Sequence, residues 1–397
     1  MSFTRREFGK LALAGIPAAA LVGRSESVFG AFAQAKPNSL IDGVQIGTIT
    51  YSYRQMTDQS AEATLKYVLD SGISAIELMG GPAESFAGIP QAPARGGGPG
   101  GPGGARGGGR GPGGAPAFDP NNLPPGTKLG EWHGEQCAVP VEGAPLAAGG
   151  GGRGPGGGGG RGRGANMTPE ELAALQAAQQ EFQAKVKAWR TSVSMDPFKK
   201  LRKMYNDAGV SIYAWKQLSP NMSDEEFEYI FNVAEALGCN HTTLELPTGP
   251  EAEAQLKRIG DFAMKKKIYA AYHTHEQGGM TVFDQAFAAS KGNMANVDLG
   301  HWVAGGNKGG SPTDFLTKYH DRTSSFHLKD RTTPDHCRLN LPWGEGETPL
   351  KAILQLVKKN KWKIPASVEL EYAIPDGSDA VKEVRKCVEF CRAALNT

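Results

Sequence analysis

The sequence predicts an α/β protein with a (β/α)8 TIM barrel, interrupted by a Gly-rich disordered insertion after its second strand. First, eight strand-like runs alternate with amphipathic, helix-like runs. Second, no GxGxxG motif follows the first strand, which argues against an open nucleotide-binding sheet. Third, on the order of 285 residues remain once the leader and the insertion are removed, which suits one barrel.

The first 35 residues have the features of an export signal. The pair Arg5 and Arg6 precedes an apolar run that is too short to span a membrane, and Ala33 and Ala35 belong to an A-x-A cleavage pattern. We therefore expect residues 1–35 to be a twin-arginine signal peptide. The mature chain is then periplasmic or secreted and has no stable membrane anchor.

The folded part is expected to occupy residues 36–397 as one barrel domain. The segments between the strand-like runs have helical apolar spacing, and several begin at Ser or Asp and end at Gly, which are typical helix caps. The expected strands are 44–53, 74–80, 210–218, 240–247, 268–275, 294–301, 324–330 and 366–372.

Residues 91–165 form a Gly/Arg/Pro-rich insertion that is expected to be disordered, except that the segment FDPNNLPPGTKLGEWHGEQ (118–136) between its Gly runs can order locally. Gly accounts for 54 of the 397 residues, and the excess lies in this tract, which cannot bury enough apolar surface to fold. Its arginines are typical of RGG-like nucleic-acid segments, but aromatic residues are nearly absent and the net charge of the chain is only +2. We therefore expect no nucleic-acid partner.

The five cysteines predict no disulfide framework, because they are scattered and odd in number. Cys387 and Cys391 lie four residues apart on an expected helix, a spacing that indicates packing rather than chemistry.

Metal-ligand side chains gather at the carboxyl ends of the later strands. In a barrel these ends meet in one bowl, and residues two apart on a strand share a face. Mixed carboxylates and imidazoles suit Mn²⁺, Zn²⁺, Co²⁺ or Fe²⁺ better than a metal that prefers thiolates. The metal-ligand candidates are Glu245, His273, Asp298, His327 and Glu369, and further polar residues there are His275, His301, Lys329, Asp330 and Glu371.

Around these residues the sequence resembles the sugar phosphate isomerase/epimerase superfamily, the xylose-isomerase-like barrels, to which endonuclease IV is distantly related. The matching phrases are YHTH, VDLGHW, FHLKD, PWGEGE and VELEY, and the resemblance runs from about Asp42 to the end, apart from the insertion. It implies one divalent metal ion held by His273 or Glu245 together with Asp298, His327 and Glu369. The epimerases usually have Glu where this chain has His273, so Glu245 is the alternative source of that carboxylate.

The resemblance and the ligand set together predict a divalent-metal-dependent sugar isomerase or epimerase, with a lyase as a variant. The metal, Mn²⁺, Zn²⁺, Co²⁺ or Mg²⁺, would polarise a sugar carbonyl and acidify the neighbouring C–H bond. Removal of that proton would give an enediolate intermediate. Glu245 and Glu369 are the candidate base and acid, and Lys329 would stabilise the oxyanion. The candidate substrate-binding residues are His275, His301, Glu371, Trp215 and Trp302.

The expected substrate is a neutral sugar, keto-sugar, glycoside or inositol-type polyol. The two glycines of WGEGE could cradle a phosphate, but Glu345 and Glu347 put negative charge in that loop. The alternatives are a non-catalytic exported sugar-binding barrel and an endonuclease IV-like phosphodiesterase. The phosphodiesterase would need extra His ligands on the expected strands 74–80 and 210–218, and these segments contain no histidine. The sequence is compatible with a homo-oligomer and does not fix the oligomeric state.

Overall fold

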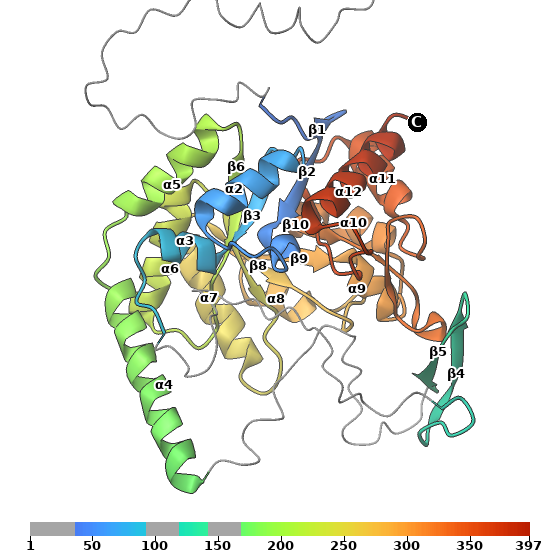
Figure 1. Cartoon of the computed structure of the whole chain (residues 1–397), viewed down its shortest axis with the longest axis horizontal. Coiled ribbons are helices and arrows are strands. Elements are labelled where there is room, and N and C mark those ends of the chain that lie inside the picture. Colours follow the sequence, from blue (N-terminus) through green and yellow to red (C-terminus); the bar gives the residue numbers. More distant parts are fainter. Residues whose placement is uncertain (1–35, 93–118, 142–167) are drawn as a thin grey trace, which may run out of the picture. The chain divides into compact units, whose positions relative to one another are not determined.

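Eight parallel strands close into a barrel in the computed structural model, which describes residues 36–92, 119–141 and 168–397 (Figure 1). This confirms the predicted (β/α)8 architecture. The predicted signal peptide lies outside the described residues, as do 93–118 and 142–167 of the Gly-rich tract. No helix among the described residues is long and apolar enough to cross a membrane.

The barrel strands follow one another in sequence order around the ring. Each pairs in parallel with its neighbours, and the pairing of Thr48 with Ile76 closes the ring between the first and second strands. A short strand, β1 (Leu40–Ile41), adds antiparallel to the first barrel strand. The barrel strands are β2 (Val44–Ile49), β3 (Ala75–Met79), β6 (Ser211–Lys216), β7 (His241–Glu245), β8 (Tyr269–His273), β9 (Asn293–Asp298), β10 (Thr323–Leu328) and β13 (Ala366–Val368).

Helices surround the strands, and several begin and end where the sequence places caps. In α6, for example, Ser223 and Glu226 form a capping box at the start, and Gly238 ends the helix with a φ of 82°. The helices are α2 (Ala61–Asp70), α3 (Gly80–Phe86), α4 (Pro169–Arg190), α5 (Asp196–Asp207), α6 (Asp224–Leu237), α7 (Ala252–Lys266), α8 (Asp284–Ala289), α9 (Leu299–Ala304), α10 (Pro312–Tyr319), α11 (Leu350–Asn360) and α12 (Ala380–Leu395), with 3-10 turns η1 (Thr50–Tyr53), η2 (His320–Arg322) and η3 (Pro334–His336).

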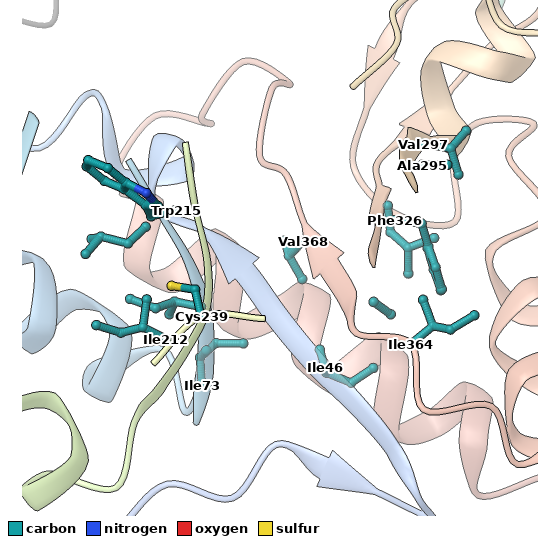
Figure 2. Packing of buried hydrophobic residues seen from close by; sticks show 14 of the residues in the cluster. Ile46, Ile73, Ile212, Trp215, Cys239, Ala295, Val297, Phe326, Ile364 and Val368 are labelled. Atoms are coloured by element: carbon teal, nitrogen blue, oxygen red, sulfur yellow. The ribbon is translucent and has the colours of Figure 1, made fainter. Parts of the chain in front are cut away.

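The hydrophobic core is built from strand residues and the apolar faces of the helices. Figure 2 shows side chains from several barrel strands in this cluster, including Ile46, Trp215, Phe326 and Val368. All four are essentially inaccessible to solvent. Burying aliphatic and aromatic side chains of this size stabilises the fold by about 1.5–3 kcal/mol each.

The middle of the Gly-rich insertion, 119–141, is ordered, which agrees with the local order allowed for 118–136. There β4 (Thr127–Trp132) and β5 (Glu135–Pro140) form an antiparallel hairpin. Its two-residue turn, His133 and Gly134, has positive φ at both positions, as tight hairpins require.

A disulfide joins Cys137 in β5 to Cys337 in the loop after β10. The expectation that the cysteines form no disulfide is therefore wrong for this pair. The two residues are 200 positions apart in sequence, and only the closed barrel brings their loops together. Cys239, Cys387 and Cys391 are buried and have free thiols.

Replacing Ile46 with Ala should lower the free energy of unfolding by about 2–5 kcal/mol, because it leaves a cavity at a fully buried strand position. Urea unfolding followed by circular dichroism measures the change. The matched control is Leu40→Ala on β1, where the side chain is 52% exposed and the change should stay within about 0.5 kcal/mol. Equal losses in the two variants would contradict the described core.

Candidate metal centre

The inside of the barrel contains a buried hydrogen-bond network centred on Glu77 of β3. Its carboxylate accepts hydrogen bonds from Thr243 Oγ1 at 2.6 Å, from Asn296 Nδ2 at 3.0 Å and from His327 Nε2 at 2.9 Å. Glu77 and His327 are completely buried. A buried carboxylate is tolerated here because a cation and two neutral donors satisfy its oxygens.

His327 is held between two carboxylates. Its Nδ1 donates to Glu369 Oε2 at 2.8 Å, on the opposite side of the ring from Glu77. Burial opposes the charge on the imidazole, but the carboxylates of Glu77 and Glu369 outweigh it and raise the pKa of His327 to about 10. Burial likewise opposes the charge on Glu77, but His327 lowers the pKa of that carboxyl to about 2.

Four predicted ligands, His327 among them, meet at the carboxyl end of the barrel. His273 ends β8, Asp298 ends β9, His327 lies in β10 and Glu369 follows β13. One ligand atom from each lies within 4.8 Å of the corresponding atoms of the other three, and all four residues are buried. Four convergent donors, two imidazole nitrogens and two carboxylate oxygens, form a set that transition metals favour.

His273 and Asp298 each keep an acceptor atom for a metal ion, and a bound cation would take the place of the proton that His327 Nδ1 donates to Glu369. The amide NH₂ of Asn296 donates to Glu77, so the Oδ1 of Asn296 is the atom that faces His273. This oxygen lies 3.2 Å from His273 Nδ1 and accepts its proton, which leaves a lone pair on His273 Nε2. Burial lowers the pKa of His273 well below its usual value, which keeps the ring neutral. Asp298 Oδ2 is buried and, within the described residues, has the ammonium of Lys329 at 3.0 Å but no hydrogen bond of good geometry. The residues therefore fit a divalent cation.

Glu245 lies outside this group of four. Its side chain is 53% exposed, and it contacts Lys216 Nζ at 2.8 Å and His275 Nδ1 at 3.4 Å. Of the two alternatives, His273 and not Glu245 lies in the group of four candidate ligands. Glu245 ends β7 and lies at the mouth of the bowl, next to His275.

Lys329 links the ligand group to the mouth of the bowl. Its ammonium lies 3.0 Å from Asp298 Oδ2, 3.0 Å from Glu369 Oε2 and 2.6 Å from Glu371 Oε2. Burial opposes the charge on Lys329, but the carboxylate of Asp298 and its neighbours raise the pKa. Lys329 therefore stays cationic next to the candidate ligands.

His301 lies beside Glu371, with 3.7 Å between its Nε2 and Glu371 Oε2. Its Nδ1 is 2.5 Å from Arg331 Nη1, and a guanidinium can only donate, so Nδ1 accepts and Nε2 carries the proton. A histidine with a proton on Nε2 can donate to a substrate oxygen. The group His273, His275 and His301 also has ligand atoms within 4.8 Å of one another, but the Arg331 contact favours His301 as a donor over His301 as a ligand.

The two predicted tryptophans point away from the bowl. Trp215 and Trp302 are fully buried, and their indole N–H groups donate to the carbonyl oxygens of Ile230 and Gly310. These two candidate substrate-binding residues therefore do not line the bowl. Trp215 faces the helix layer because neighbouring strand residues alternate, and Lys216, the next residue, faces Glu245 instead.

Sequence reasoning missed several residues of the site, among them Glu77, Lys216 and Arg331. Glu77 had a readable signal, since it is the one acidic residue in the apolar run AIELM of β3. An unpaired charge is too costly in such a strand, so an acidic residue there indicates a buried partner. Lys216 is the last residue of β6, and Arg331 directly follows FHLKD. Nothing in the sequence around either residue marks it as part of a site.

The WGEGE loop is closed to phosphate by Asp330. Its carboxylate accepts from the backbone amides of Gly344, Gly346 and Thr348, at 2.8, 3.0 and 3.1 Å. A Cβ at Gly346 would come within 2.3 Å of Asp330 Oδ1. The amides that could have bound an anion are thus already occupied.

The family model described as "Xylose isomerase-like TIM barrel" matches residues 171–393. That match covers more than half of the chain, and the protein belongs to this family. A search of curated proteins found no match.

Solved structures similar to this chain include a sugar phosphate isomerase/epimerase from Parabacteroides distasonis. It shares 15% identity over 95% of this chain and 100% of that chain, with a TM-score of 0.49. The probable 3-DHS dehydratase AsbF of Bacillus anthracis shares 12% identity over 87% and 98%, also with a TM-score of 0.49. The 3-keto-D-glucoside 4-epimerase YcjR of E. coli shares 11% identity over 50% and 85%, with a TM-score of 0.40.

Replacing Glu77 with Gln should weaken divalent metal binding about 10–100-fold, because the amide orients His327 less firmly than the carboxylate does. Isothermal titration with Mn²⁺ or Zn²⁺ measures the affinity. The matched control is Glu383→Gln, which changes a buried carboxylate of α12 outside the barrel network and should leave the affinity unchanged. Equal affinities in the wild type and Glu77→Gln would show that Glu77 has no role in the site.

Proposed function

We propose that this protein is a divalent-metal-dependent sugar isomerase or epimerase, with β-elimination as the related outcome. One observation carries the proposal: His273, Asp298, His327 and Glu369 converge within 4.8 Å at the carboxyl end of a closed barrel. In barrels of this kind the active site lies at that end. Two imidazoles among the four ligands favour a transition metal such as Zn²⁺, Co²⁺ or Mn²⁺ over Mg²⁺.

A bound metal would supply Lewis acidity that polarises a sugar carbonyl and acidifies the neighbouring C–H bond. The residues at the mouth of the bowl then handle the protons and the charge. Lys329, cationic and beside two ligands, is placed to stabilise oxygen charge that develops there. Glu245 is a carboxylate outside the ligand group, paired with Lys216 at the mouth of the bowl, and we assign it the role of accepting a proton from carbon.

The remaining polar groups suit a hydroxyl-rich substrate. Glu371 offers carboxylate oxygens as acceptors, while His301 offers the N–H on Nε2 as a donor. His275 is 54% exposed beside Glu245 and reaches the same mouth. The carboxylate of Glu369 belongs to the ligand group, so Glu369 would act as acid or base while it also holds the metal.

We favour a neutral sugar, keto-sugar, glycoside or inositol-type substrate over a sugar phosphate. The support is Asp330, which occupies the amides of the WGEGE loop that could otherwise hold a phosphate. Glu347 adds a second carboxylate there, 2.8 Å from His336. A phosphate at this loop would face negative charge and lack free donors.

We also propose that the protein works outside the cytoplasm. The twin-arginine pattern of the first 35 residues supports this location, and so does the disulfide between Cys137 and Cys337. Structural disulfides persist in oxidising compartments such as the periplasm and are rare in the reducing cytosol.

Elemental analysis tests the metal site directly. We expect about one divalent ion per chain in the purified wild type, as one set of four ligands implies. The double variant Glu369→Gln, His327→Ala should contain almost none, because it removes two of the four ligands. A wild type that stays empty after Mn²⁺, Co²⁺ and Zn²⁺ are offered would overturn the proposed enzyme and favour a sugar-binding barrel.

Lys329→Met should lower kcat by about 10²–10³-fold if the ammonium stabilises developing oxygen charge. The readout is exchange of a carbon-bound proton of a keto-sugar with deuterated water, followed by NMR. Metal content should be retained, since Lys329 is not a ligand. The control Lys199→Met changes a lysine whose side chain is 65% exposed on α5 and should exchange like the wild type. Unchanged exchange in Lys329→Met would remove this residue from the reaction.

A further inference from the structure

The loop from Asp330 to Leu341 leaves the barrel beside the candidate metal centre and needs support from outside itself. Its ends pair as two short strands, β11 (Asp330–Arg331) and β12 (Asn340–Leu341), with η3 between them. At its tip Cys337 and Arg338 have φ values of 70° and 52°, in the left-handed region that costs a non-glycine residue energy. Surrounding contacts must therefore hold this conformation.

The β4–β5 hairpin supplies those contacts. The disulfide ties Cys137 to Cys337 at the tip, and the ring of Trp132 packs on His336 with 4.7 Å between centroids. The backbones also meet closely, since a Cβ on Gly130 would lie 2.8 Å from the carbonyl oxygen of Asp335. The hairpin thus meets the loop through a covalent bond, an aromatic contact and a close backbone approach.

The supported loop in turn positions a residue of the proposed active site. The carbonyl oxygen of Arg338, next to Cys337, accepts from Arg331 Nη2 at 2.6 Å. Arg331 is 2% exposed, and its Nη1 lies 2.5 Å from His301 Nδ1. A continuous chain of contacts therefore runs from the disulfide through Arg338 and Arg331 to the imidazole of His301.

We propose that the β4–β5 hairpin is a disulfide-anchored brace that positions His301. The brace holds the loop 330–341 so that Arg331 fixes His301 with its proton on Nε2, facing Glu371 and the bowl. Cys137, Cys337, Trp132 and Arg331 are then positioning residues that act through His301. The use of that N–H by a sugar rests on the proposed function, whereas the brace itself does not.

Hydrogen exchange tests the brace without any substrate. In the full-length double variant Cys137→Ser, Cys337→Ser, amides of the loop, such as those of Thr332 and Arg338, should exchange at least about tenfold faster, because their bonds depend on the supported tip. Amides of β9 and β10 should exchange as in the wild type. The control Lys128→Ala removes an exposed ion pair between the same hairpin and Asp335 and should change neither rate.

The tautomer of His301 is the second readout. Long-range ¹H–¹⁵N NMR of histidine-labelled protein, assigned with His301→Gln, should show the Nε2–H form in the wild type and in Lys128→Ala. The double cysteine variant should show a mixture of both tautomers. Trp132→Ala keeps the disulfide and should show a smaller change of the same kind, so it provides the test if the cysteine variant does not fold.

Three results would overturn the brace. The first is a loop that exchanges at the wild-type rate without the disulfide. The second is faster exchange throughout the barrel, which would make the disulfide a general stabiliser. The third is a loosened loop around a His301 that keeps one tautomer, which would break the link through Arg331. Metal content measured on the same samples separates these results from failure of the proposed enzyme, because none of the brace residues belongs to the ligand group.

Discussion

The buried ion pair between Glu77 and His327 is the constraint on which the rest of the site depends. Charges inside a barrel are tolerated only when every oxygen and nitrogen has a partner, and here Thr243, Asn296 and Glu369 complete the set. That requirement fixes the ring plane of His327 and, through Asn296, the orientation of His273. The two imidazoles among the candidate ligands are therefore oriented by a network whose residues come from five different barrel strands or strand ends.

The sequence was sufficient to predict the eight strands and the residues that converge at their ends, because both depend on local patterns. Alternation of strand and helix gave the barrel, and the fold then carried His273, Asp298, His327 and Glu369 to one place. What could not be predicted was the direction of side chains at strand ends. Trp215 and Lys216 are neighbours, and only the register of β6 decides which one faces the bowl.

Glu245 and the cysteines illustrate a second limit. Spacing along the chain placed Glu245 one strand from His273, but whether it reaches the metal depends on a partner, Lys216, that holds it at the mouth. Cys137 and Cys337 are 200 residues apart, with the bond formed between a hairpin inside a Gly-rich tract and a loop of the barrel. Pairings of that length are decided by tertiary structure, so the cysteine count alone was misleading.

Two strands and one strand end each contribute residues two positions apart: His273 with His275, His327 with Lys329, and Glu369 with Glu371. The first member of each pair lies in the ligand group, and the second lies toward the mouth. The site thus has two layers of side chains from the same stretches of backbone, with the candidate ligands deeper in the barrel and the other residues nearer the mouth. Substitutions of the residues near the mouth change none of the four candidate ligands, so such a barrel can change the molecules it accepts over evolutionary time while it keeps that ligand set.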